Sequence, residues 1–184
     1  MSRLSIASLA ALLLAAACSP RPPRGGAQQE EPPPQVVLYG ARLKSYQGEQ
    51  LTLSGTAERL TYQRAGGDVQ GTNATLVVPP GRASERAPAG TSGGIRVSAP
   101  NMEGNLASKQ LVGSGGVVIR TGEGMEARTP RLTYDASTQR ANGNEGVTVT
   151  GPDYRLRADR FELSFPDETF IFAGSVETVL GAAE

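Results

Sequence analysis

The chain has 184 residues, and its 18 basic side chains balance its 18 acidic ones. This balance argues against a nucleic-acid ligand, because phosphate binding needs a basic surface. The chain has no histidine and a single cysteine, Cys18, so it lacks the commonest general base and cannot form an internal disulfide. We therefore expect no enzymatic activity, no cofactor and no metal site.

The N-terminus is typical of an exported protein. An apolar run at residues 9–17 is too short to cross a bilayer as a helix. Small residues before the lone Cys18 are typical of a bacterial lipoprotein signal, although Ala15 stands where that signal usually has leucine. Residues 1–17 would then be a signal peptide and Cys18 would be lipidated. The alternative is a secretory signal cleaved near Ala17, with Cys18 incidental.

Residues 18–35 are expected to form a lipid-anchored tether. Six prolines and two glycines between residues 19 and 35 leave too little apolar surface for a core. Such a segment is partly extended where prolines cluster. The remaining residues, 36–184, are long enough for one folded domain.

Short apolar runs without helical periodicity fill the first part of that domain. Strands are expected at residues 36–39, 50–62, 75–78 and 95–97, with a kink at Gly55. Residues 79–94 are too long and polar for a tight hairpin. At typical strand lengths of about five to six residues, the domain would hold roughly 14 to 16 short strands.

Residues 125–181 carry the clearest pattern. Apolar and polar residues alternate in four runs, at 132–134, 147–150, 161–165 and 170–172. Turn-forming residues separate the runs. A period of two places every second side chain on one face of a strand, so this stretch predicts an antiparallel meander with one apolar face.

The pattern also repeats. A small residue is followed 18 positions later by a valine in three pairs, and the copies start 30 and 29 residues apart: Ala99 and Val117, Thr129 and Val147, Ala158 and Val176. Equal spacing indicates one supersecondary unit that is reused and stacked on its neighbour. Ala57 begins an earlier, imperfect copy that lacks the valine.

Residues 50–62 contain an Ala-x-x-apolar-x-Tyr motif at positions 57–62. Residues 125–180 contain the same motif with Thr129 in place of alanine, followed by turns and the pair Gly146-Val147. Both segments resemble the LptA/LptC (OstA-like) family of periplasmic lipopolysaccharide-export proteins. The resemblance implies an all-β fold, an open antiparallel β-jellyroll of about 15 short strands over residues 36–184. Two features depart from the family pattern: the lipoprotein signal replaces a transmembrane helix, and the loop at 79–94 is additional.

The resemblance also implies that the interior holds the acyl chains of lipopolysaccharide. Glycines at positions 113, 115, 143 and 174 would leave gaps in the apolar face for these chains. The alternative is that the same inward residues simply form a packed core. The interior residues are Leu132, Tyr134, Val147, Val149, Phe161, Leu163, Phe170, Phe172 and Val176.

Partners follow from the same resemblance. The last strand would pair with residues 169–173 and expose its other edge to a periplasmic LptA-like jellyroll; its residues are Ser175, Val176, Glu177, Thr178, Val179 and Leu180. Residues 36–46 would face the periplasmic domains of an LptF/LptG-like inner-membrane transporter. The function implied is transfer of lipopolysaccharide along a bridge, by a lipoprotein anchored in a membrane, favoured as the inner one. A structural or adhesive β-repeat lipoprotein is the alternative.

Overall fold

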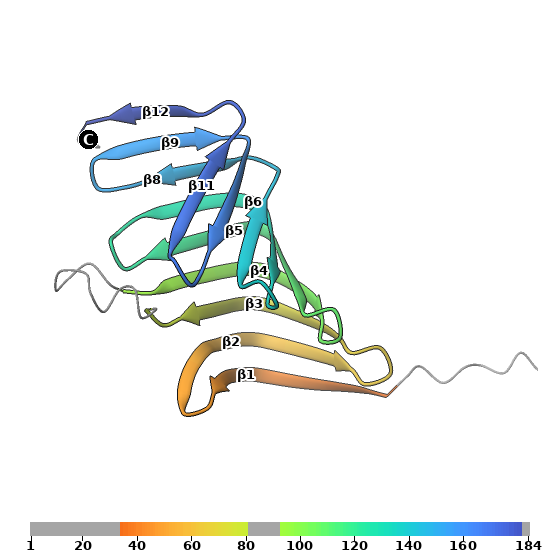
Figure 1. Cartoon of the computed structure of the whole chain (residues 1–184). Coiled ribbons are helices and arrows are strands. Elements are labelled where there is room, and N and C mark those ends of the chain that lie inside the picture. Colours follow the sequence, from red (N-terminus) through yellow and green to blue (C-terminus); the bar gives the residue numbers. More distant parts are fainter. Residues whose placement is uncertain (1–33, 81–92, 182–184) are drawn as a thin grey trace, which may run out of the picture. The chain divides into compact units, whose positions relative to one another are not determined.

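The computed structural model describes residues 34–80 and 93–181 (Figure 1). The expected signal peptide, the site at Cys18, nearly all of the tether and most of the 79–94 loop lie outside these residues. The described strands belong to one compact unit, Pro33–Glu184. In this part of the chain, no helix is long and apolar enough to cross a membrane.

The described residues form twelve strands, and every pair is antiparallel. The first six are long and follow one another as a meander: β1 (Gln35–Gln47), β2 (Gln50–Gln63), β3 (Asp68–Val78), β4 (Ile95–Asn105), β5 (Gln110–Thr121) and β6 (Glu126–Asp135). The last six are short: β7 (Arg140–Gly143), β8 (Val147–Thr150), β9 (Tyr154–Ala158), β10 (Arg160–Ser164), β11 (Thr169–Ala173) and β12 (Glu177–Leu180).

The sheet divides into two branches at β6. The end of β6, residues 133–135, pairs with β7, whereas its start, residues 126–128, pairs with β8. The chain then alternates between branches: β10 and β11 extend from β7, while β9 and β12 extend from β8. Figure 1 shows that β10 and β11 run in a different direction from β8, β9 and β12.

Each branch continues into one portion of the six long strands. We call the branch that ends in β12 the β12 half-sheet; it includes residues 41–47, 50–57, 74–78, 95–99, 117–121 and 126–129 of β1–β6. The branch that ends in β11 is the β11 half-sheet; it includes residues 35–39, 59–63, 68–72, 101–105, 110–114 and 131–135. The long strands therefore cross from one half-sheet to the other.

A bend in each long strand makes this crossing possible. In β5, Gly115 and Gly116 adopt φ values of 85° and 99°, which favour glycine, and the β4–β5 and β5–β6 registers shift there. The residues opposite this point include Pro100 in β4 and Pro130 in β6, which cannot donate a ladder hydrogen bond. The bends lie side by side, so they form one fold line across the sheet.

Small side chains line the inner side of the fold line. Cross-strand pairs there include Ala74 with Ala99, Val117 with Thr129, and Val147 with Ala158. These side chains are buried where the two half-sheets come together. The sequence repeat of a small residue and a later valine is therefore the repeat of this bend.

The core lies between the inward faces of the two half-sheets. Val149 of the β12 half-sheet and Leu163 of the β11 half-sheet are both fully buried in one apolar cluster. The cluster is concentrated in β4–β10, and none of its buried members comes from β1 or β2. The core therefore fills the C-terminal part of the fold and leaves the first strands uncovered.

The all-β, open antiparallel class expected from the sequence is confirmed, with differences in detail. The described residues hold twelve strands rather than roughly 14 to 16, because β2 and its neighbours continue through their bends. The predicted meander at 125–181 is interrupted: β7 and β8 occupy different half-sheets and do not pair with each other. The last strand begins at Glu177 rather than Ser175 and pairs with β9, not with residues 169–173.

Candidate functional site: an apolar groove

The inward face of the β11 half-sheet is built by alternation. In β10, Phe161 and Leu163 point into the core, and their partners Phe172 and Phe170 on β11 lie beside them. Ile171, between those partners, points outward and is 58% exposed. Phe170 stacks on Phe161 and on Phe172, with ring centroids 6.4 and 5.9 Å apart.

The structure brings together nearly all of the predicted interior residues. Five are buried and three are partly buried against the same core cluster. Val176 differs from expectation: it precedes β12 and is 45% exposed. Its predecessors Val117 and Val147 are buried because a later strand pairs with each of them, and Val176 has no such strand among the described residues. The buried ones are Leu132, Val147, Val149, Phe161 and Leu163; the partly buried ones are Tyr134, Phe170 and Phe172.

The glycines of the inward face are not gaps. Gly143 is paired with Phe161, whose ring occupies the place where a Cβ atom would lie. A Cβ atom on Gly113 would lie 3.2 Å from the Cβ of Ala99, and one on Gly174 would meet the side chain of Asp159. Neighbouring side chains therefore fill the space beside Gly113 and Gly143, whereas Gly115 and Gly174 are exposed and do not belong to the inward face. The C-terminal part of the interior is packed.

The open space lies toward the N-terminal strands. On β1, the inward side chains Leu38 and Leu43 are 46% and 52% exposed. Leu60 and Leu76, on β2 and β3, are half-buried. The inward apolar face thus runs across the whole sheet, from β11 to β1, and becomes uncovered as it approaches β1.

A groove of about 460 Å³ lies where the covered and uncovered parts meet. Leu53 and Val78 come from the β12 half-sheet, and Leu111, Tyr134 and Phe165 from the β11 half-sheet and its loops. The rings of Tyr134 and Phe165 meet edge to face, with centroids 5.1 Å apart, and form one wall. The groove is therefore walled by both half-sheets.

The groove is uncharged, and its lining combines apolar side chains with neutral polar ones. Its polar lining consists of hydroxyl and amide side chains, including Gln47, Gln50 and Gln139, and it contains no carboxylate, ammonium or guanidinium group. Burial, followed by the nearby charge of Asp135, raises the pKa of the Tyr134 phenol, so this group stays neutral. The leucine, valine and phenylalanine side chains of this lining can contact an apolar ligand, and the lining offers no general acid or base that works near neutral pH.

Sequence reasoning found only Tyr134 among the groove residues. Leu51, Leu53 and Val78 lie in recognised strands, but alternation alone does not reveal which distant strands will face one another. Phe165 ends an alternating run, and the contact with Tyr134 joins two different strands. One sequence signal could have identified part of the groove. The period of two at residues 51–53 places Leu51 and Leu53 on one face of the strand.

The C-terminal end of the sheet presents two edges among the described strands, β11 and β12. The four residues of β12 are all exposed. The N–H of Gly181 donates to the carbonyl of Asp153 directly opposite, at 3.0 Å. This bond shows which residues of β12 direct their backbone groups toward β9. In an antiparallel ladder the bonded pairs alternate, so the N–H groups of Thr178 and Leu180 point away from β9.

The sequence model of the family described as "Lipopolysaccharide-assembly, LptC-related" matches residues 56–180, which span β2 to β12. The chain belongs to this family. Membership in the LptC-related family supports a component of lipopolysaccharide transport in the periplasm. The matched range contains the core, the bends of β2–β6 and most of the groove.

One similar solved structure is LptH of Pseudomonas aeruginosa, described as the LptA-homologous periplasmic component of a lipopolysaccharide transport device. It is 10% identical to this LptC-related chain with a TM-score of 0.30, and the match covers 80% of this chain and 95% of LptH. No curated protein matches the chain.

Proposed function

We propose that this LptC-related chain is a non-enzymatic bridge protein of the periplasm. It receives lipopolysaccharide from an inner-membrane ABC transporter and passes it along a β-jellyroll bridge toward the outer membrane. The observation that supports this most strongly is the continuous inward apolar face, which is covered over β7–β11 and open over β1–β3. A ligand can enter such a face from the side without unfolding the core.

Acyl chains match the chemistry of the groove. Each methylene that moves from water into an apolar site contributes about 0.8 kcal/mol. The groove volume of about 460 Å³ lies in the range of small-molecule sites. Leu51 and Leu53 would contact the chains from one side, and Leu111 and Phe165 from the other. The polar amides at the rim would remain hydrated.

The two ends of the sheet suit two different partners. The β12 edge, with Ser175 and Val176 before it, would bind a periplasmic LptA-like jellyroll by strand addition. The β1 edge, over residues 36–46, would face the LptF/LptG-like domains of the transporter. Unpaired backbone groups on an exposed edge strand provide the donors and acceptors for such contacts.

Membrane attachment would come from Cys18. In this proposal residues 1–17 are removed, Cys18 is lipidated, residues 18–35 are the tether and residues 36–184 are the folded domain. The inner membrane suits a protein that accepts cargo from a transporter there. A Cys18→Ala protein should leave the membrane fraction on washing with 1 M salt, whereas the wild type should remain; retention of both would contradict the lipid anchor.

A photo-crosslinking experiment tests the transport proposal. Leu53 and Thr61 of β2 are both half-buried, but Leu53 lines the groove and Thr61 lies on the outward face of the β11 half-sheet. A benzoylphenylalanine at position 53 should capture lipopolysaccharide in cells, and the same group at position 61 should not. Equal labelling, or no labelling at position 53, would argue against lipid in the groove.

The packed C-terminal core favours one alternative. Val149 and Leu163 are fully buried, as they would be in a structural or adhesive β-repeat lipoprotein that binds no lipid. In that case position 53 would remain unlabelled while the protein stays folded and membrane-attached. The same experiment therefore separates the two functions.

A further inference from the structure

The outward face of the β12 half-sheet concentrates basic side chains in a chain with no net charge. Residues opposite one another on adjacent strands form rows across this face. One row contains Lys44, Arg96, Arg120 and Arg155 on β1, β4, β5 and β9, with Glu126 on β6. The basic residues of this row are all exposed.

A second row lies two residues further along the strands. It contains Arg42, Arg128 and Arg157, with Glu177 at the β12 edge. Hydroxyl side chains of serine and threonine occupy most of the positions between the basic residues. Basic groups thus outnumber acidic groups strongly over both rows; the other acidic residues of this half-sheet, such as Glu123 and Asp153, lie in turns or at the fold line.

Internal ion pairs neutralise only the centre of this face. Glu126 pairs with Arg120 and Arg128, each at 2.7 Å. Burial opposes ionisation of Glu126, but hydrogen bonds from both arginines outweigh it and lower the pKa of its carboxyl. Within residues 34–80 and 93–181, no ion pair holds Arg96, Arg155 or Arg157.

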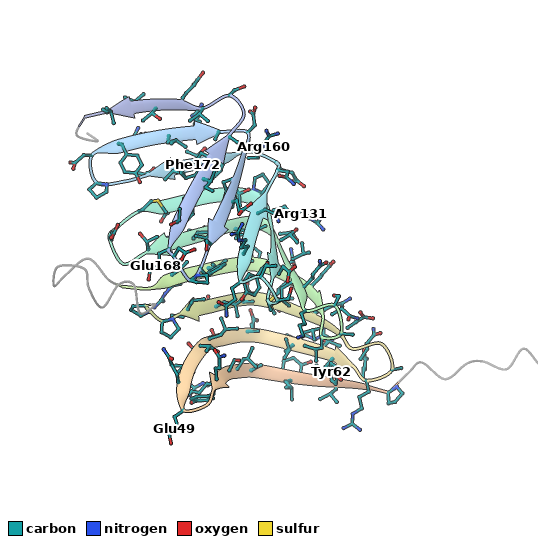
Figure 2. All side chains as sticks on the ribbon, in the orientation of Figure 1. Glu49, Tyr62, Arg131, Arg160, Glu168 and Phe172 are labelled. Carbon is teal, nitrogen blue, oxygen red and sulfur yellow. The ribbon has the colours of Figure 1, made fainter. Side chains whose placement is uncertain are left out.

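The outward face of the β11 half-sheet has no such excess. Its arginines are offset by carboxylates on the same face, and Arg140 pairs with Glu162 at 2.6 Å. Figure 2 labels Arg131 and Arg160 on this half-sheet. The arginines are Arg59, Arg131, Arg140 and Arg160, and the carboxylates are Asp68, Glu103, Asp135 and Glu162. The two outward faces therefore differ in charge although they belong to one sheet.

We propose that the basic face of the β12 half-sheet docks on the anionic phospholipid headgroups of a bilayer. A two-row array of exposed cationic side chains complements a planar anionic surface, and each lysine or arginine near such a surface strengthens binding several-fold. No aromatic side chain lies in the two rows to stack on the bases of a nucleic acid. Arg96 and Arg120 line a hollow of about 290 Å³, and Arg96, which no ion pair holds within the described residues, would be available there to a headgroup phosphate.

The inference goes beyond the transport role and does not depend on lipid in the groove. It is compatible with the proposed anchor, because residues 19–35 would span at most roughly 60 Å when fully extended. Docking through the β12 half-sheet would leave the outward face of the β11 half-sheet turned away from the bilayer. The domain would then have a fixed orientation on the membrane rather than a free one.

The test measures vesicle binding of the full chain carrying Cys18→Ala, so that no lipid anchor contributes. Flotation compares vesicles of phosphatidylcholine alone with vesicles containing one-third phosphatidylglycerol, at 0.1 M and 0.5 M NaCl. The protein should bind the anionic vesicles at least about tenfold more strongly at low salt, and lose this preference at high salt because ions screen the attraction.

Two matched variants locate the binding face. The triple change Arg96→Gln, Arg155→Gln and Arg157→Gln should reduce binding to anionic vesicles at least about tenfold. The triple change Arg59→Gln, Arg131→Gln and Arg160→Gln removes the same charge from the other face and should change binding less than about threefold. Circular dichroism confirms that both variants fold.

Replacement by lysine separates a bilayer from a specific phosphate ligand. If the face docks on a bilayer, Arg96→Lys, Arg155→Lys and Arg157→Lys should bind nearly as well as the arginine form, since only charge is required. Loss of binding in the lysine variant would indicate bidentate recognition of one phosphate group and overturn the proposal. Equal losses in the two glutamine variants, or binding that ignores phosphatidylglycerol, would also overturn it.

Discussion

The ring of Phe161 lies over Gly143 on the neighbouring strand, in the space that any larger residue at position 143 would need for its Cβ atom. The pair joins β10 to β7 at the centre of the β11 half-sheet. Phe161 in turn stacks on Phe170, so the position of its ring sets the position of the next aromatic residue. The absence of a side chain at Gly143 is therefore part of the core packing.

Gly143→Ala should destabilise the domain by about 1–3 kcal/mol, because the added methyl group displaces the Phe161 ring and forces it from its rotamer. Chemical denaturation should show a lower midpoint with an unchanged slope. Asn142→Ala is the matched control, since Asn142 is exposed and the change leaves the packing of Phe161 on Gly143 untouched. Similar stability in the two variants would contradict the close packing of Phe161 on Gly143.

The sequence predicted most of the residues that share the inward face, because alternation follows directly from strand geometry; Val176 is the exception, since it precedes β12 and is exposed. It also predicted the repeat, since a bend needs a small residue such as Ala99 or Ala158 wherever two half-sheets meet. It did not predict that the strands continue through the bend. Gly55 indicated a kink within a strand, but the same signal could equally have ended one.

The groove was harder to predict for a different reason. Leu53 and Phe165 are far apart in the chain, and their approach depends on the branching of the sheet at β6. No local pattern records that β7 and β8 pair with different ends of one strand. The glycines were misinterpreted as gaps for a related reason: the bulky neighbour that covers Gly143 belongs to another strand.

The closed end of the interior provides a second prediction. Phe172 points inward and is partly buried, whereas Ile171 points outward. If acyl chains reach the aromatic cluster, a photo-crosslinking residue at position 172 should capture lipopolysaccharide and one at position 171 should not. Equal labelling at both positions would show that lipid reaches this edge from outside the groove.

A carboxylate fastens the turn that leads into β12. Asp159 accepts a hydrogen bond from the backbone N–H of Ser175 at 2.8 Å. This bond, together with one from the Ser175 side chain, lowers the pKa of Asp159 below its ordinary value of 3.8. A lowered pKa means that the stabilising contribution is complete above the ordinary value and is lost as pH falls through the folded-state value.

Asp159→Asn should therefore be less stable than the wild type at pH 7, and the difference should shrink in acid, as the pH falls through the lowered pKa of the Asp159 carboxyl. Urea denaturation at pH 7 and in acid measures this difference. Hydrogen exchange should also become faster at the Ser175 amide in Asp159→Ala. Asp153→Asn, in an exposed turn, serves as the control; a pH-independent difference for Asp159→Asn would refute the hydrogen bond to the charged form.

The last prediction concerns the free edge of β12. It follows from which residues of β12 direct their N–H groups toward β9 and which direct them toward the open side. The bond from Gly181 to Asp153 places the N–H of Val179 toward β9 and the N–H of Thr178 toward the open side. A proline at position 178 thus removes a donor that only a partner strand would use. A proline at position 179 removes a bond that holds β12 in its own sheet.

Thr178→Pro should weaken capture of a periplasmic LptA-like partner about two- to tenfold, the value of one lost hydrogen bond, while the melting temperature stays nearly constant. Val179→Pro should weaken capture and also increase hydrogen exchange in β9. Glu177→Ala changes an exposed side chain without removing a backbone donor, so it should capture the partner normally if strand addition drives binding. If Thr178→Pro and deletion of residues 175–184 both leave capture unchanged, the partner does not bind at this edge.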